Sequence, residues 1–190
     1  IMLGAPFASG VGFYVFYAMQ PNLLNLFGDP NAYSIAGLAA ALLAGSQIIG
    51  SFLAPVVKRM FQLRTSALLV GEVLGIAGLL VFGIIKDFWS AIVFLGLWAM
   101  LVAALQPVRQ AYLNSLIPSK QRATVLSFDS LLGSTGGVVI QPILGRVADI
   151  GSYSLSFVVG GFIQALAIPL AVLARGEQVK AEAKPQRKKK

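Results

Sequence analysis

Long apolar stretches alternate with short polar breaks along the whole chain. Each stretch reaches the ~20 apolar residues that a helix needs to cross a bilayer, and none shows the strict alternation of a barrel strand. Turn residues separate the stretches, as in Gly28-Asp29-Pro30-Asn31 and Asp149-Ile150-Gly151-Ser152. The pattern therefore predicts an all-α membrane protein whose six spans cover residues 1–27, 33–57, 66–85, 88–113, 121–147 and 154–174.

Composition narrows the chemistry that such a protein can perform. The chain is 57% hydrophobic and 12% charged, with no cysteine and no histidine, whereas soluble domains carry about 25% charged residues. Thiol nucleophiles and histidine acid–base catalysis are excluded, and no Gly-rich phosphate loop with a following Lys-Ser/Thr is present. We expect no cofactor, no metal site and no nucleic-acid partner, and a membrane-embedded enzyme is a weak alternative.

The basic residues predict how the spans are oriented. One side of the membrane would hold the polar tail, residues 175–190, and two basic loops that contain Lys58, Arg59, Arg64, Lys120 and Arg122. The other side has only Lys86 and Arg146. Because basic loops stay in the cytoplasm, we expect both chain ends to be cytoplasmic in a cell (inner) membrane. The tail is predicted to be disordered, with contact to anionic lipids as the alternative.

Proline positions suggest an internal repeat of three helices. Three Gln-Pro pairs lie inside predicted spans: Gln20-Pro21, Gln106-Pro107 and Gln141-Pro142. The first two fall at matching points of the first and fourth spans, as two inverted three-helix repeats would require. Because proline cannot donate to the carbonyl four residues earlier, the pairs should free the carbonyls of Tyr17, Ala103 and Val138. These interruptions indicate either a transport pathway or helix kinks that only shape the packing.

Three ionisable residues, Glu72, Arg109 and Asp129, fall inside predicted spans. At about 1.5 Å per residue, all three would lie roughly 6–12 Å inside the cytoplasmic boundary. An unpaired charge there is costly, so we expect an ion pair between Arg109 and Asp129. Arg122 is the rival partner of Asp129, and Glu72 has no obvious partner.

An ordered set of features resembles the tenth and eleventh spans of major facilitator superfamily transporters. It comprises Arg109-Gln-Ala-Tyr-Leu-Asn114, Ile117-Pro118, Arg122-Ala-Thr124, Ser127, Gly136-Gly137, Pro142, Gly145 and Asp149. The resemblance extends over the whole chain and implies the C-terminal half of a twelve-span fold. The chain opens directly in an apolar span without an initiating methionine, so we expect it to be a piece of a longer protein. Its partners would be the lipid bilayer, the missing N-terminal six-helix half and a small-molecule substrate.

One loop departs from the family pattern. The loop after the second span keeps its basic residues, but no acidic residue and no second glycine match the family's G-x-L-x-D-R-x-G-R-R. The acid-mediated latch of that loop therefore does not carry over to this chain. The resemblance implies a secondary active transporter that moves a small solute by alternating access, with proton-coupled efflux as one form. A membrane channel or assembly subunit is the alternative.

The resemblance also implies which spans face the solute. In the family, the first and fourth spans line the central cavity, and the second and fifth contribute to it. Their polar and aromatic residues give the substrate-lining candidates Tyr14, Tyr17, Gln20, Gln47, Trp98 and Gln106. The charge-network or proton-coupling candidates are Arg109, Asp129, Glu72 and Arg122.

Two roles are open for Asp129. It belongs to a charge network that holds or releases the cytoplasmic gate, or it takes up one proton in each transport cycle. The first role is favoured, because the position is shallow and a neighbouring arginine stabilises the charged form.

Overall fold

The computed structural model describes residues 2–61 and 63–183, with side chains placed through Glu177. This part of the chain is helical, with short connections. Its elements are η1 (Met2–Gly4), α1 (Ala5–Phe27), α2 (Tyr33–Met60), α3 (Arg64–Ile84), α4 (Phe88–Leu116), η2 (Ser119–Gln121), α5 (Arg122–Ile150), α6 (Tyr153–Ala165) and α7 (Ile168–Ala183). Six helical segments of the described chain are long and apolar enough to cross a membrane. The prediction of an all-α fold with six spans is confirmed.

The last span differs from the prediction in two ways. The segment Tyr153–Glu177 is divided into α6 and α7 by a turn at Leu166 and Ala167. Pro169 explains the turn, because it has no N–H to donate to the carbonyl of Ala165. In addition, α7 continues to Ala183, beyond the expected end of the span at residue 174. Residues 184–190 of the expected tail lie outside the described residues.

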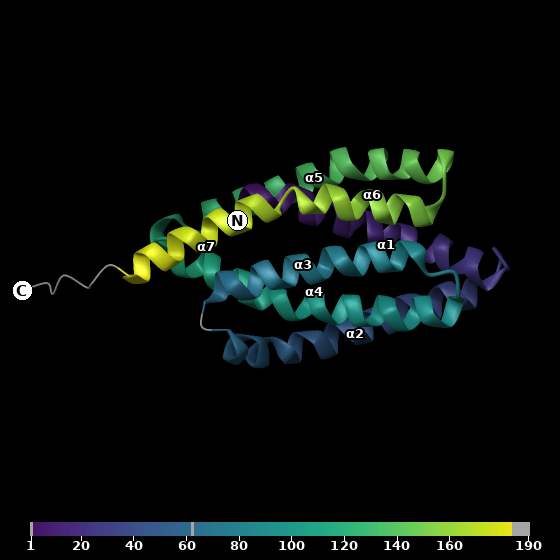
Figure 1. Cartoon of the computed structure of the whole chain (residues 1–190), viewed down its shortest axis with the longest axis horizontal. Coiled ribbons are helices and arrows are strands. Elements are labelled where there is room, and N and C mark those ends of the chain that lie inside the picture. Colours follow the sequence, from purple (N-terminus) through teal and green to yellow (C-terminus); the bar gives the residue numbers. More distant parts are fainter. Residues whose placement is uncertain (1, 62, 184–190) are drawn as a thin grey trace, which may run out of the picture.

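The spans run antiparallel, and Figure 1 shows which connections share an end of the bundle. The α2–α3 and α4–α5 connections lie at the left of the view, where α7 also ends. The α1–α2, α3–α4 and α5–α6 connections lie at the right. The left end carries both predicted basic loops, and we refer to it as the basic end.

Helix pairing follows the expected internal symmetry. The most extensive interfaces join α1 to α5, α2 to α4, and α3 to α6. If α1–α3 and α4–α6 are the two repeats, exchanging them converts the α1–α5 interface into the α4–α2 interface and leaves the α3–α6 interface in place. The pairing is therefore the one that two inverted three-helix repeats produce.

Glycines allow the two symmetry-related pairs to approach closely. A Cβ on Gly136 of α5 would lie 2.6 Å from the Cα of Pro6 in α1, and a Cβ on Gly50 of α2 would lie 2.8 Å from the Cα of Met100 in α4. Both neighbours are main-chain atoms, which no rotamer change can move. Gly50 and Gly136 are separated in the sequence by the same interval as Pro21 and Pro107. Small residues at such crossings let helices pack in the absence of a hydrophobic driving force.

The buried core draws on all six spans, and most of its residues lie on α1 and α4. Phe157 of α6 is 1% exposed and packs against the rings of Tyr14 and Phe82. Leu79 of α3 and Met19 of α1 are also buried in this cluster. The core packs α1 against α6 of the scaffold pair α3 and α6, while α1 makes its most extensive interface with α5.

Candidate functional site

A paired charge is buried between α4 and α5. Arg109 donates from Nη1 to Oδ2 of Asp129 at 2.7 Å and from Nη2 to Oδ1 at 2.6 Å. The side chain of Asp129 is 8% exposed and that of Arg109 is 22% exposed. A two-point arginine–carboxylate pair is both strong and geometrically specific. The predicted ion pair is confirmed, and its role stays a prediction.

The rival partner of Asp129 is directed elsewhere. Arg122 is exposed, and its Nη2 lies 3.4 Å from the main-chain oxygen of Asn114 near the end of α4. Arg64 reaches the same stretch of α4, where its Nη1 donates to the carbonyl of Ala111 at 2.9 Å. Cations near the C-terminal end of a helix are favourable because they face its exposed carbonyl groups. These arginines therefore secure the basic end and leave Asp129 to Arg109.

Glu72 has a partner that the sequence did not indicate. It is half-buried on α3, and its Oε1 accepts a hydrogen bond from Nε2 of Gln164 on α6 at 3.0 Å. Gln164 is 8% exposed. The second intramembrane carboxylate is thus held by a neutral amide in the scaffold, away from the α4–α5 pair.

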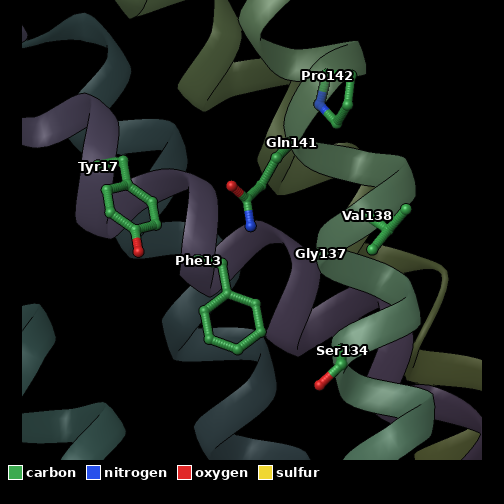
Figure 2. Close-up of a pocket in the computed structure, with 7 residues that line it drawn as sticks. All are labelled: Phe13, Tyr17, Ser134, Gly137, Val138, Gln141 and Pro142. Atoms are coloured by element: carbon green, nitrogen blue, oxygen red, sulfur yellow. The ribbon is translucent and has the colours of Figure 1, made fainter.

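A groove of about 450 Å³ opens between α1 and α5 (Figure 2). No charged residue lines it. Its lining residues are Phe13, Tyr17, Ser134, Gly137, Val138, Gln141 and Pro142. The side chain of Gln141 extends from α5 toward α1 and ends between the rings of Tyr17 and Phe13. An apolar site with a few convergent polar groups is the usual form of a small-molecule pocket.

Gly137 makes room for this arrangement. A Cβ at Gly137 would lie 2.9 Å from the Phe13 ring and 3.1 Å from the Gln141 amide nitrogen. Both neighbours are side-chain atoms, unlike the main-chain atoms that face Gly136. Gly137 therefore determines how closely the aromatic ring and the amide approach each other at the floor of the groove.

Two prolines leave main-chain acceptors free on residues that line the groove. Pro21 and Pro142 lie inside α1 and α5, so the carbonyls of Tyr17 and Val138 lack the amide that would normally bond them. Tyr17 and Val138 both line the groove. Two of the three carbonyls expected to be freed thus belong to residues of one site, on facing helices.

The substrate-lining candidates do not form one surface. Tyr17 is 65% exposed and lines the groove. Tyr14 is buried and hydrogen-bonded to Ser156 on α6. The indole Nε1 of Trp98 donates to the carbonyl of Gly75 on α3 at 3.2 Å.

On the fourth span, Trp98 is thus directed at α3 and Arg109 at α5. The three remaining candidates lie outside the groove: Gln20 is half-buried on α1, and Gln47 and Gln106 are exposed on α2 and α4.

Sequence reasoning missed part of the groove. Phe13 carried no motif, and Val138 was noted only for its carbonyl. Gln141 was noted as the third Gln-Pro pair but was not proposed as a lining residue. The available signal was helical spacing, since Ser134, Gly137, Val138 and Gln141 follow the i, i+3, i+4, i+7 pattern of one helix face.

The inverted six-span bundle, with its buried ion pair and its groove between crossing helices, defines the class as a multi-pass helical membrane protein of the transporter type. A family model described as Major Facilitator Superfamily matches residues 2–190. The chain therefore belongs to this family of membrane transporters. A search of curated proteins finds no match.

Proposed function

We propose that the chain is the C-terminal half of a secondary active transporter that moves a small solute by alternating access. The observation that carries the proposal is the uncharged groove at mid-span, where two proline-interrupted helices face each other. Interrupted helices at a repeat interface are typical of transporter binding sites. The second half of the transporter would cover this face and complete the cavity.

The groove favours a neutral solute with an apolar or planar part and hydrogen-bond donors. The rings of Phe13 and Tyr17 provide the apolar walls. The freed carbonyls of Tyr17 and Val138 accept hydrogen bonds, and the amide of Gln141 both donates and accepts. A charged solute would find no counter-charge among the lining residues.

We assign the Arg109–Asp129 pair to the gate at the basic end. Asp129 lies on α5 five residues before Ser134, which is about 7.5 Å closer to the basic end than the groove. The pair joins α4 to α5 at that depth, so breaking it frees the two helices to separate there. A cytoplasmic location of the basic end, with both chain ends on that side, is part of the same proposal.

Cysteine accessibility tests the proposal without knowledge of the solute. The chain contains no cysteine, so Ser134→Cys adds a single thiol to it at the groove. In the full-length protein in sealed vesicles, a membrane-impermeant maleimide should label this thiol from either side. Adding Asp129→Asn should raise labelling from the basic end about tenfold for every ~1.4 kcal/mol that the pair contributes to the closed gate.

The matched control is Phe162→Cys on α6, which is 65% exposed on the scaffold. This thiol should stay unlabelled from both sides, with or without Asp129→Asn. Labelling of the groove thiol from one side only would refute alternating access. Equal rates of labelling of the Ser134→Cys thiol from the basic end, with and without Asp129→Asn, would refute the assignment of the ion pair to the gate.

A further inference from the structure

The two intramembrane carboxylates have partners of different chemistry. Asp129 is held at both oxygens by the guanidinium of Arg109, whereas Glu72 accepts one hydrogen bond from the amide of Gln164. In the part of the chain that the structure describes, no cation lies within ion-pair distance of Glu72. The charge of Asp129 is therefore neutralised directly, and that of Glu72 is not.

The two partners also differ in which protonation states of a carboxyl group they can hydrogen-bond. Arginine has only donors, so it stabilises an ionised carboxylate and has nothing to accept from a protonated one. A glutamine amide has a donor and an acceptor. It can donate to ionised Glu72, as observed, and after rotation it can also accept from the O–H of protonated Glu72. Gln164 thus suits both states of Glu72, while Arg109 suits only ionised Asp129.

The charges of the intramembrane residues point the same way. Both terminal nitrogens of Arg109 are already bonded to Asp129. The three side chains of Glu72, Arg109 and Asp129 together carry a net charge of −1 when Glu72 is ionised and zero when Glu72 carries a proton. Uncompensated charge inside a membrane is costly.

The other described charged residues on the packed elements have contacts of their own or lie at the end of a helix. Arg64 on α3 donates to Ala111, and Arg175 on α7 donates to Ser66. Glu177 on α7 has an interaction of its own. Helix α6 contains no Asp, Glu, Lys or Arg, and α2 touches α3 only slightly, with its basic residues, Lys58 and Arg59, in its last turn.

We propose that Glu72, held by Gln164, is a proton-binding site of the transporter. The proton adds to a carboxylate oxygen of Glu72 to give the neutral acid, and the same proton is released when the carboxylate re-forms. This inference rests on the proposed function in assuming that proton binding changes the access of the groove.

The position of Gln164 gives the proton a mechanical route. The main-chain carbonyl of Gln164 accepts the N–H of Ala167 at 2.9 Å, within the turn that divides α6 from α7. A rotation of the Gln164 side chain that follows protonation of Glu72 therefore takes place directly beside this turn, which would act as the hinge of the last span. α7 packs against both α3 and η1, so the hinge is connected to the start of α1.

Infrared spectroscopy of the full-length protein in lipid tests the proton site directly. Acidification should produce the C=O band of a buried protonated carboxyl. Glu72→Gln should abolish this band, and Asp129→Asn should leave it. Gln164→Leu should retain the band at a shifted frequency, because the carboxyl remains while its amide partner is lost. A band that persists in Glu72→Gln, or that disappears in Asp129→Asn, overturns the proposal.

A conservative variant, Glu72→Asp, tests the assignment if Glu72→Gln does not fold. Glu72→Asp retains a carboxyl one methylene further from Gln164, so its band should shift in the same sense as in Gln164→Leu. An unshifted band in Glu72→Asp contradicts the assignment.

The groove thiol at Ser134 provides a separate readout of coupling. Its labelling rate should depend on pH in the parent protein and become independent of pH in Glu72→Gln. If the infrared band belongs to Glu72 but labelling remains one-sided at every pH, the proton site stands and alternating access fails. The two proposals are therefore distinguished.

Discussion

The close crossing of α1 and α5 predicts that Gly136→Ala destabilises the bundle. The new Cβ would lie 2.6 Å from the Cα of Pro6, whereas ordinary van der Waals contact begins at 3.4 Å. Its other near neighbours are the carbonyl carbon and oxygen of Pro6. All of these atoms belong to the main chain, so α1 must move away over its first turn.

Two opposing terms decide the size of the effect. Overpacking costs about 1–3 kcal/mol, and a clash with main-chain atoms belongs at the upper end of that range. Replacing a helical glycine by alanine returns about 0.5–1 kcal/mol through propensity. The net loss in the free energy of unfolding should therefore be close to ~2 kcal/mol.

Gly145→Ala is the matched control, since Gly145 is on the same helix and has nothing within 4 Å of its would-be Cβ. This variant should be neutral or slightly more stable than the parent protein. Reversible unfolding in mixed detergent micelles, followed by circular dichroism, measures both variants. If Gly136→Ala is as stable as Gly145→Ala, the helices do not cross at Gly136 as described.

Three further predictions concern individual contacts. Arg109→Gln should cost about 3–5 kcal/mol because it leaves Asp129 buried without its counter-charge, and adding Asp129→Asn should recover most of that loss in a double-mutant cycle. Trp98→Phe should cost about 0.5–1.5 kcal/mol by removing one hydrogen bond to α3, and a change in groove labelling without a change in unfolding would contradict this structural role. Hydrogen bonds from the N–H and then the hydroxyl of Ser90 lower the pKa of Asp87, the N-cap of α4. The cap therefore contributes stability above the ordinary Asp pKa of 3.8 that is lost as the pH falls through the lower folded value. The melting temperatures of the parent protein and Asp87→Ala should accordingly differ at neutral pH and converge at strongly acidic pH.

The six spans could be predicted because the bilayer constrains them so strongly. Length and apolarity determine which segments cross a membrane, and all six expected segments are helical. The ends were less certain, since helical turns continue past the last apolar residue, as in α2 to Met60 and α4 to Leu116. The break at Leu166 was missed because Pro169 was not weighed.

The ion pair was also predictable, and for a physical reason. Arg109 and Asp129 lie on consecutive antiparallel spans at matching depth, so the cost of unpaired charge brings them together. The partner of Glu72 could not be found in this way. Gln164 is neutral and lies far away in the sequence, so only the packing of α3 on α6 reveals it.

The groove could not be predicted from any single segment, because it depends on how two helices cross. Helical spacing could have grouped the four α5 residues, but only the crossing at Gly136 determines which face of α1 lies opposite them. That crossing sets Phe13 and Tyr17 beside Gln141 and leaves Tyr14, three residues from Tyr17, in the scaffold. Phe13 and Tyr17 therefore line the groove and Tyr14 lies in the core, because α5 crosses α1 at Gly136.

The chain separates fixed charge from exchangeable charge by its choice of partner. Arg109 holds the carboxylate of Asp129 by two hydrogen bonds and joins α4 to α5 near the basic end. Under the proposed assignment, the amide of Gln164 lets Glu72 change its protonation state beside the turn that divides the last span. A gate that must close reproducibly needs the first kind of contact, and a step that responds to pH needs the second. The double variant Arg109→Gln, Gln164→Arg exchanges the two partners. It should therefore transfer the titrating infrared band from Glu72 to Asp129.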